Sequence, residues 1–77
     1  MSDFENKVRS FLVEQFRIEI GSIERTTPLF SNGLLDSFAM VELVAFVEAE
    51  SGSRIKARDL TLENFDSLER ISGFIYR

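Results

Sequence analysis

The sequence contains no histidine and no cysteine, and these two absences exclude most of the chemistry that a small protein performs by itself. Without them there is no Ser-His-Asp or Cys-His nucleophile, no zinc site of the usual nitrogen and sulfur ligands, and no disulfide framework. The carboxylates that remain do not show the spacing of a calcium-binding loop, so no metal site is predicted. We therefore expect that the protein is not an enzyme.

The charge and the apolar runs narrow the range of partners. A formal net charge of -4 argues against a nucleic-acid-binding protein, which would show a basic face, and it favours partners with basic docking surfaces. No apolar run is long enough to span a membrane, and Met1 is followed at once by the polar stretch SDFENK rather than by a signal peptide. We expect a cytoplasmic monomer.

The length of 77 residues allows one domain, residues 1–77, and the spacing of its apolar residues predicts helices throughout. The first helix lies in SDFENKVRSFLVEQF, where Ser2 and Glu5 form a capping box. The last lies in DSLERISGFIYR, where Asp66 and Glu69 form a second capping box. The residues expected to face the core from these two helices are Phe4, Val8, Phe11, Leu12, Leu68, Ile71, Phe74 and Ile75.

Between these helices lie two irregular stretches. From Arg17 to Asp36 the helical periodicity fades, and a connection this long is usually functional or fixed by its own side chains. We expect it to be fixed by its apolar residues, which are Ile18, Ile20, Ile23, Leu29, Phe30, Leu34 and Leu35. Gly33 is expected to have a positive φ. A single short helical turn is predicted near Ala57 to Leu60.

The second helix, from about Ser37 to Glu50, carries apolar residues on two separate arcs when they are placed at about 100° per residue. The first arc is the expected core face, with Met40, Leu43, Val44 and Val47. The second arc lies beside Ser37 and consists of Phe38, Val41 and Ala45, flanked by Glu42 and Glu48. A small domain can bury both arcs, but an exposed apolar stripe with an acidic rim usually marks a docking surface, which is the interpretation that we favour.

Ser37 stands between an acid and a phenylalanine at the start of this helix. An Asp-Ser pair at such a position is in most proteins simple capping chemistry, but here Asp36 already provides the N-cap. The hydroxyl of Ser37 then lies near unbonded N–H groups and the positive end of the helix dipole, a setting that favours a phosphate ester. With no histidine to activate it, Ser37 is suited to modification by another enzyme, and a hydrolase is disfavoured.

The residues around Ser37 resemble a motif of a known protein family. LLDSF followed by MVELVAFVE resembles the attachment motif of acyl and peptidyl carrier proteins, and the loop TTPLFSNGLLDS and the tail DLTLENFDSLERI extend the resemblance over nearly the whole chain. It implies an all-α, four-helix carrier bundle with three main helices, one short helix, and a long loop between the first two. It also implies that Ser37, supported by Asp36, carries 4′-phosphopantetheine as a phosphodiester.

The same resemblance implies the partners. A phosphopantetheinyl transferase would install the arm from coenzyme A, and acyl- or aminoacyl-adenylating ligases, synthases or transferases would load and unload a thioester on it. Docking would use the face of Phe38, Val41, Glu42, Ala45 and Glu48. The pathway could be fatty acid, polyketide or nonribosomal peptide biosynthesis, because all of these use the same attachment chemistry.

The sequence departs from the fatty-acid-synthesis carriers in two places. Ala39 stands where those proteins usually have an acid, and Arg54, Lys56 and Arg58 fall in a region that is acidic in them. The basic cluster is either a solvated loop or a surface that changes which partner docks there. The less acidic rim and the LLDS motif are more similar to those of stand-alone aminoacyl carriers, such as the D-alanyl type, or of specialised acyl carriers.

Two alternatives stay open. A helical adaptor that binds partners through the second helix and is never modified would explain the exposed stripe without the arm. Phe46 and Phe65 could line a cavity for a bound acyl chain, although packing in the core is the preferred interpretation.

Overall fold

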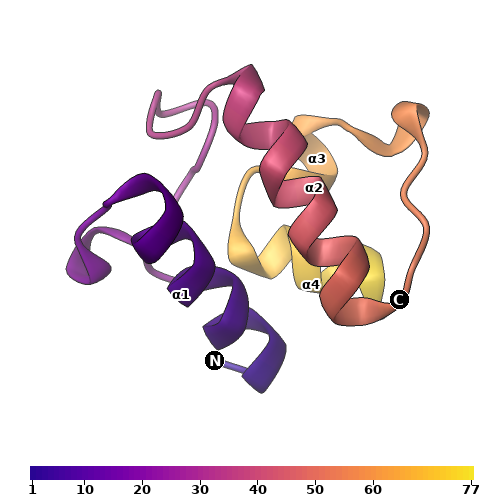
Figure 1. Ribbon diagram of the computed structural model, residues 1–77, viewed down its shortest axis with the longest axis horizontal. Helices are drawn as coiled ribbons and strands as arrows, with labels where there is room; N and C mark the ends of the chain where they lie inside the picture. The colour runs from indigo at the N-terminus through magenta and orange to yellow at the C-terminus, as the bar shows by residue number, and fades with distance from the viewer.

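The computed structural model describes all residues from Met1 to Arg77 and contains only helices, turns and loops (Figure 1). The elements in chain order are α1 (Asp3–Phe16), the 3-10 turn η1 (Ile20–Ser22), α2 (Ser37–Ser51), the 3-10 turn η2 (Ala57–Asp59), α3 (Leu62–Phe65) and α4 (Leu68–Ile75). The prediction of an all-α, four-helix fold is confirmed. None of these helices combines the length and the apolar character needed to cross a membrane.

The first two long helices begin where their capping residues predict. In α1 the Ser2 hydroxyl accepts a hydrogen bond from the Glu5 N–H at 3.1 Å, and the Glu5 carboxylate accepts one from the Ser2 N–H at 3.2 Å. In α2 the Asp36 carboxylate accepts a hydrogen bond from the Ala39 N–H at 2.9 Å. Each cap satisfies backbone donors that the helix itself cannot satisfy. At its other end, α2 stops at Gly52, whose φ of 74° is one that glycine adopts readily.

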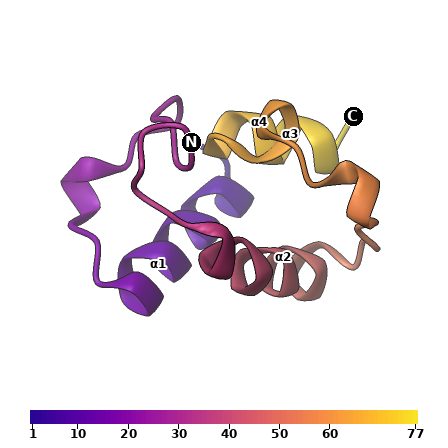
Figure 2. The ribbon, with the colours of Figure 1, turned by 90° about the horizontal axis from the view of Figure 1, so that it is seen from above.

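The core lies between α1 and α2 on one side and the α3–α4 corner on the other. Figure 2 shows α3 and α4 together on the opposite side of the molecule from α2. Leu43 and Val47 of α2 are completely buried, and Phe65 of α3 is buried with them. Phe65 is therefore a core residue, in agreement with the preferred interpretation. The remaining buried apolar residues are Phe4, Val8, Leu12, Ile23, Leu29, Leu35, Ala39, Leu68 and Ile71.

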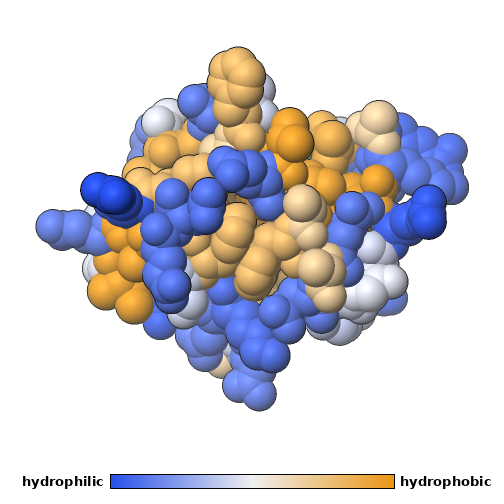
Figure 3. Space-filling view, in the orientation of Figure 1, coloured by the Kyte–Doolittle hydropathy of each residue, from blue (hydrophilic) through white to orange (hydrophobic).

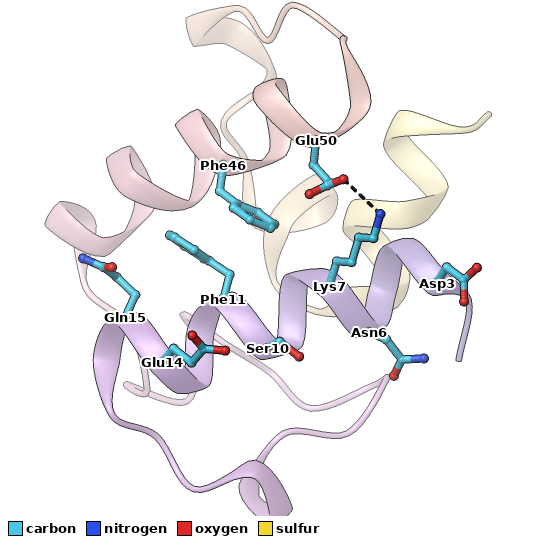
Figure 4. A pocket seen from close by; sticks show the side chains of 9 residues that line it. All are labelled: Asp3, Asn6, Lys7, Ser10, Phe11, Glu14, Gln15, Phe46 and Glu50. Carbon is cyan, nitrogen blue, oxygen red and sulfur yellow. Dashed lines mark hydrogen bonds and ion pairs between the residues drawn. The ribbon is translucent and has the colours of Figure 1, made fainter.

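A seam of aromatic rings joins the helices at the edge of this core. Phe11 of α1 and Phe46 of α2 stack face to face, with their ring centroids 4.3 Å apart, in an open groove of about 580 Å³ (Figure 4). The ion pair between Lys7 and Glu50, at 3.3 Å, crosses the same groove. Phe46 is therefore half-buried between α1 and α2 rather than part of an enclosed cavity. At the N-terminal end of α1, the rings of Phe4 and Tyr76 form a T-shaped pair, with centroids 5.2 Å apart.

The predicted capping box of the last helix is wrong. The N-cap of α4 is Ser67, whose hydroxyl accepts a hydrogen bond from the Arg70 N–H at 3.1 Å. Asp66 lies one residue earlier, and its carboxylate accepts hydrogen bonds from the long loop instead. Both residue types are good caps, so the tertiary contact decides which of the two adjacent residues caps the helix.

Of two further predictions about irregular segments, one is confirmed in part and the other is wrong. The turn expected near Ala57 to Leu60 exists as η2, but the short fourth helix is α3, which begins one residue after Thr61. The Thr61 hydroxyl accepts a hydrogen bond from the Asn64 N–H and so provides the cap. Ile20 is expected to hold the long loop against the core, but 55% of its surface is exposed, because η1 turns it outward. The other apolar residues of that loop are buried or half-buried.

Candidate functional site

Ser37 is the first residue of α2, and its side chain is exposed. Two buried neighbours fix this position, because Leu35 and Ala39 lie on either side of it in the sequence and both pack into the core. No acceptor in the protein bonds the backbone N–H groups of Ser37 and Phe38, whereas the Ala39 and Met40 N–H groups bond to Asp36. The Ser37 hydroxyl thus stands at a helix N-terminus with two free donors, a local environment that favours an anionic substituent.

The chain contains a second Asp-Ser pair, Asp66 and Ser67, and the serines of the two pairs differ in exposure. Ser67 is 4% exposed, and its hydroxyl is occupied as the cap of α4. Ser37 is exposed, and Asp36 performs the capping role in its place. Of these two serines, only Ser37 therefore presents a hydroxyl that another enzyme can reach without unfolding a helix.

The loop that leads to Ser37 is fixed to the corner between α3 and α4. The Asp66 carboxylate accepts hydrogen bonds from the N–H groups of Phe30 and Ser31, at 2.7 and 2.9 Å, and from the Ser31 hydroxyl. Partial burial opposes the ionisation of Asp66, but the hydrogen bonds from Ser31 and Phe30 outweigh it and lower the pKa of this carboxyl. Close by, the Leu29 N–H bonds to the carbonyl of Asp66, and Gly33 has the predicted positive φ, at 77°.

A second set of contacts fixes the middle of the same loop. The Arg25 guanidinium binds both carboxylate oxygens of Glu5, at 3.0 and 3.2 Å, and also the Glu69 carboxylate at 2.7 Å. Glu5 is 2% exposed, and this burial works against its ionisation. The hydrogen bonds from the Ser2 N–H and from Arg25 more than compensate and lower the pKa of Glu5. One loop residue therefore ties α1 to α4.

The two arcs of α2 separate as the sequence predicts. Leu43 and Val47 are buried and Met40 and Val44 are half-buried, while Phe38 is 81% exposed and Val41 is 70% exposed. Ala45 is exposed one turn beyond Val41. In Figure 3 apolar residues gather over the N-terminal part of α2 and over the neighbouring η2–α3 segment.

Leu60 and Leu62 of that neighbouring segment were missed by sequence reasoning. Leu62 is 53% exposed and Leu60 is 38% exposed. The only signal in the sequence is that both stand in a short, non-periodic stretch, where an apolar residue has no predicted face. The acids predicted for the rim, in contrast, already have partners within the protein. Glu42 accepts a hydrogen bond from the Gln15 side chain at 3.0 Å, and Glu48 accepts one from the Ile55 N–H at 2.7 Å.

No group of three or more acidic side chains gathers to hold a metal ion. Among known proteins, a family model for the phosphopantetheine attachment site matches residues 6–75. The chain belongs to this carrier family. No curated protein sequence matches it. The chain thus contains the attachment site for a covalent 4′-phosphopantetheine group. The surroundings of Ser37 fit that group, because an exposed hydroxyl and two free N–H donors lie together there. Carriers of this family act with synthases, transferases and a phosphopantetheinyl transferase.

Proposed function

We propose that the chain is an acyl or aminoacyl carrier protein whose arm is attached to Ser37. The observation that supports this most directly is the contrast between the two Asp-Ser pairs, of which only Ser37 is exposed. When bound, 4′-phosphopantetheine supplies a thiol that holds the cargo as a thioester. The protein itself provides position and recognition, and we propose that it is not an enzyme, because partner enzymes supply the catalytic groups.

Attachment to Ser37 requires a base from the transferase. The hydroxyl must lose its proton as its oxygen bonds to the phosphorus of coenzyme A and the nucleotide part of coenzyme A leaves. The chain has no histidine, and Asp36 is engaged as the cap of α2. Ser37 therefore contributes the acceptor oxygen, and the first turn of α2 contributes N–H donors and a positive dipole that stabilise the phosphodiester.

The exposed face of α2 is our proposed docking surface for partner enzymes. Phe38, Val41 and Ala45 form its apolar centre, and Glu42 and Glu48 form its acidic rim. One carboxylate oxygen of each acid is bonded within the protein, and the other has no protein partner, so it is free to meet a cation on the partner enzyme. A carrier held at this surface delivers its cargo at a high effective concentration.

The cargo is proposed to be aminoacyl or a specialised acyl group rather than a housekeeping fatty acyl group. Ala39, at the position where fatty-acid carriers usually have an acid, packs against the core and adds nothing to the acidic rim. The basic residues after α2 change the surface further. A monomeric state and a cytoplasmic location are also part of this proposal.

The deciding experiment is attachment in vitro. Incubation with coenzyme A, magnesium and a broad-specificity phosphopantetheinyl transferase should increase the intact mass by one phosphopantetheine, which peptide mapping should place on Ser37. The variant Ser37→Ala should remain unmodified while keeping its helicity and melting temperature, because the cap of α2 is Asp36.

The matched control is Ser67→Ala, which alters the other Asp-Ser pair. This variant should still be modified, although it should melt earlier because it loses the cap of α4, a loss of about 0.5–2 kcal/mol. Modification of Ser67, or no modification by several transferases, would overturn the proposal. The second result would favour the unmodified adaptor.

A further inference from the structure

A basic hollow lies at the opposite end of α2 from Ser37. It has a volume of about 350 Å³ and lies between the segment that follows α2 and the C-terminal end of α4. Its cations are Arg54, Lys56, Arg58 and Arg77. Because α2 has 15 residues, its C-terminal end, where the segment that lines the hollow begins, is about 22 Å from Ser37 along the helix.

The charge of the protein is strongly segregated at this hollow. Four of the nine cationic residues and one of the thirteen carboxylates line it, so the hollow carries a formal charge of +3 and the rest of the chain -7. None of the four cations forms an ion pair, whereas the ion pairs of the protein are made by Lys7 and Arg25. Figure 3 shows strongly hydrophilic residues at the rim on the right, over the segment that follows α2.

The backbone that carries three of these cations is held in place. The Ile55 N–H bonds to the Glu48 carboxylate at 2.7 Å, and the Ile55 side chain packs against the core. The one carboxylate in the hollow, Asp59, accepts a hydrogen bond from the Lys56 N–H at 3.0 Å and so serves the turn of η2. Three of the four cations, Arg54, Lys56 and Arg58, are therefore presented by a fixed segment, not by a loop without contacts of its own.

The hollow also has an apolar component. Phe74 and Ile75 of α4 are half-buried and line it, and the Arg77 guanidinium lies 4.7 Å from the centre of the Phe74 ring. A cation over an aromatic face is attracted to the ring, which holds the guanidinium beside the hollow. A ligand that fits must therefore combine negative charge with an apolar group.

We propose that this basic hollow is a docking surface for an acidic segment of a partner protein. Carboxylates of that segment face Arg54, Lys56, Arg58 and Arg77, and an apolar side chain between them covers Phe74 and Ile75. The surface is remote from Ser37, and binding to it does not require the arm. It thus goes beyond the carrier function and gives the protein a second contact area, of opposite charge to the rim of α2.

The charge on the rest of the molecule favours a short acidic segment over a long polyanion. A nucleic acid or an anionic membrane extends well beyond a hollow of about 350 Å³ and would meet the remaining charge of -7. A short acidic segment of a protein can place all its carboxylates within the hollow, and it then avoids that repulsion.

The test uses the full unmodified protein and a synthetic peptide in which glutamates flank a single leucine. In a titration followed by the backbone amide signals of the isotope-labelled protein, the shifts should be saturable and confined to residues 53–59 and 74–77. The affinity should fall as salt is added, because exposed charges are screened. A peptide with lysine in place of each glutamate should cause no shifts.

The variant that tests the cations is Arg54→Gln combined with Arg58→Gln, which should weaken the binding of the glutamate peptide by about tenfold or more. The matched control is Arg17→Gln combined with Arg70→Gln, which removes the same charge elsewhere and should bind normally. The proposal is overturned if no saturable shift occurs at the hollow or if both pairs of substitutions weaken binding equally. It is also overturned if duplex DNA or phosphatidylglycerol vesicles bind there more tightly than the peptide.

Discussion

The hydroxyl of Ser31 donates a hydrogen bond to the Asp66 carboxylate across 2.6 Å, although the two residues are far apart in the chain. This contact, with those from the backbone to the same carboxylate, attaches the long loop to the residue immediately before the cap of α4. The next buried residue along the loop, Leu35, leads directly into Asp36 and Ser37. The position of the candidate attachment serine thus depends on an acid for which the local sequence predicts only a capping role.

Replacing Asp66 by alanine is predicted to loosen this loop. The variant Asp66→Ala loses an ionised acceptor of three hydrogen bonds and should lower the free energy of unfolding by about 1–3 kcal/mol. The measurement is thermal or urea denaturation. As a control, Glu63→Gln alters an exposed carboxyl that has no hydrogen-bond partner and should melt like the parent. Equal stability of both variants would show that water replaces Asp66 without loss.

The same carboxyl gives a prediction about pH. Because the pKa of Asp66 is lower in the folded protein than in the unfolded chain, its stabilising contribution is complete above the ordinary carboxyl pKa of about 4. That contribution is lost as the pH falls through the lower pKa of the folded state. The stability of Asp66→Ala should therefore fall less steeply than that of the parent below about pH 4. Parallel curves of stability against pH would contradict the prediction.

The pair formed by Arg25 and the buried Glu5 is suited to a double-mutant cycle. Arg25→Gln should destabilise the protein, because it leaves the Glu5 carboxylate buried without its cationic partner. In a Glu5→Gln background the same change should cost much less, since no charge remains to be compensated. Urea denaturation of the four proteins measures the coupling. Additive effects would mean that Arg25 acts through Glu69 alone.

Removal of the cap beside the proposed attachment site should weaken α2. Asp36→Ala is predicted to lower the free energy of unfolding by about 0.5–2 kcal/mol and to slow the modification of Ser37. Asp3→Ala, which removes an acid from the first turn of α1 without removing a cap, serves as the comparison. If Asp36→Ala melted normally but were modified poorly, Asp36 would act in recognition by the transferase and not as a cap.

The two faces of α2 can be tested with one substitution at two nearby positions. Leu43→Asp places an unpaired carboxylate in the core and should largely unfold the domain, because this cost rivals the whole stability of a small protein. Val41→Asp should keep the fold, since that side chain is 70% exposed.

The second variant should nevertheless impair loading by partner enzymes, because it places a charge in the centre of the proposed apolar docking face. Circular dichroism melting of both variants and loading kinetics of the folded one are the measurements. Normal loading of Val41→Asp would show that partner enzymes dock elsewhere than on this part of α2.

Local sequence patterns were sufficient to predict where the two long helices begin and which faces of α2 are buried. The capping box of Ser2 and Glu5 and the N-cap Asp36 act within one helical turn, so their effect can be predicted from adjacent residues. The inward and outward arcs of α2 follow in the same way from helical geometry. The exposed position of Ser37 is a consequence of these features, so it can be inferred from the residues around it.

Contacts between distant segments determine the features that local sequence patterns could not predict. Asp66 and Ser67 are equally good local caps, and the choice between them depends on N–H groups of the long loop that need an acceptor. The ion pairs of Arg25 and the exposure of Leu62 likewise depend on how the loops return to the bundle. The gathering of Arg77 with the basic segment after α2 joins two parts of the chain that no local pattern connects.

The packing of Tyr76 against Phe4 gives this protein an internal spectroscopic reporter. Tyr76 is the one tyrosine of a chain without tryptophan, so ultraviolet fluorescence and near-ultraviolet dichroism at the tyrosine band arise from a single known position. That position joins the beginning of α1 to the residue after α4. Its signal follows the closure of the two ends of the chain, with no label attached and no disturbance at Ser37.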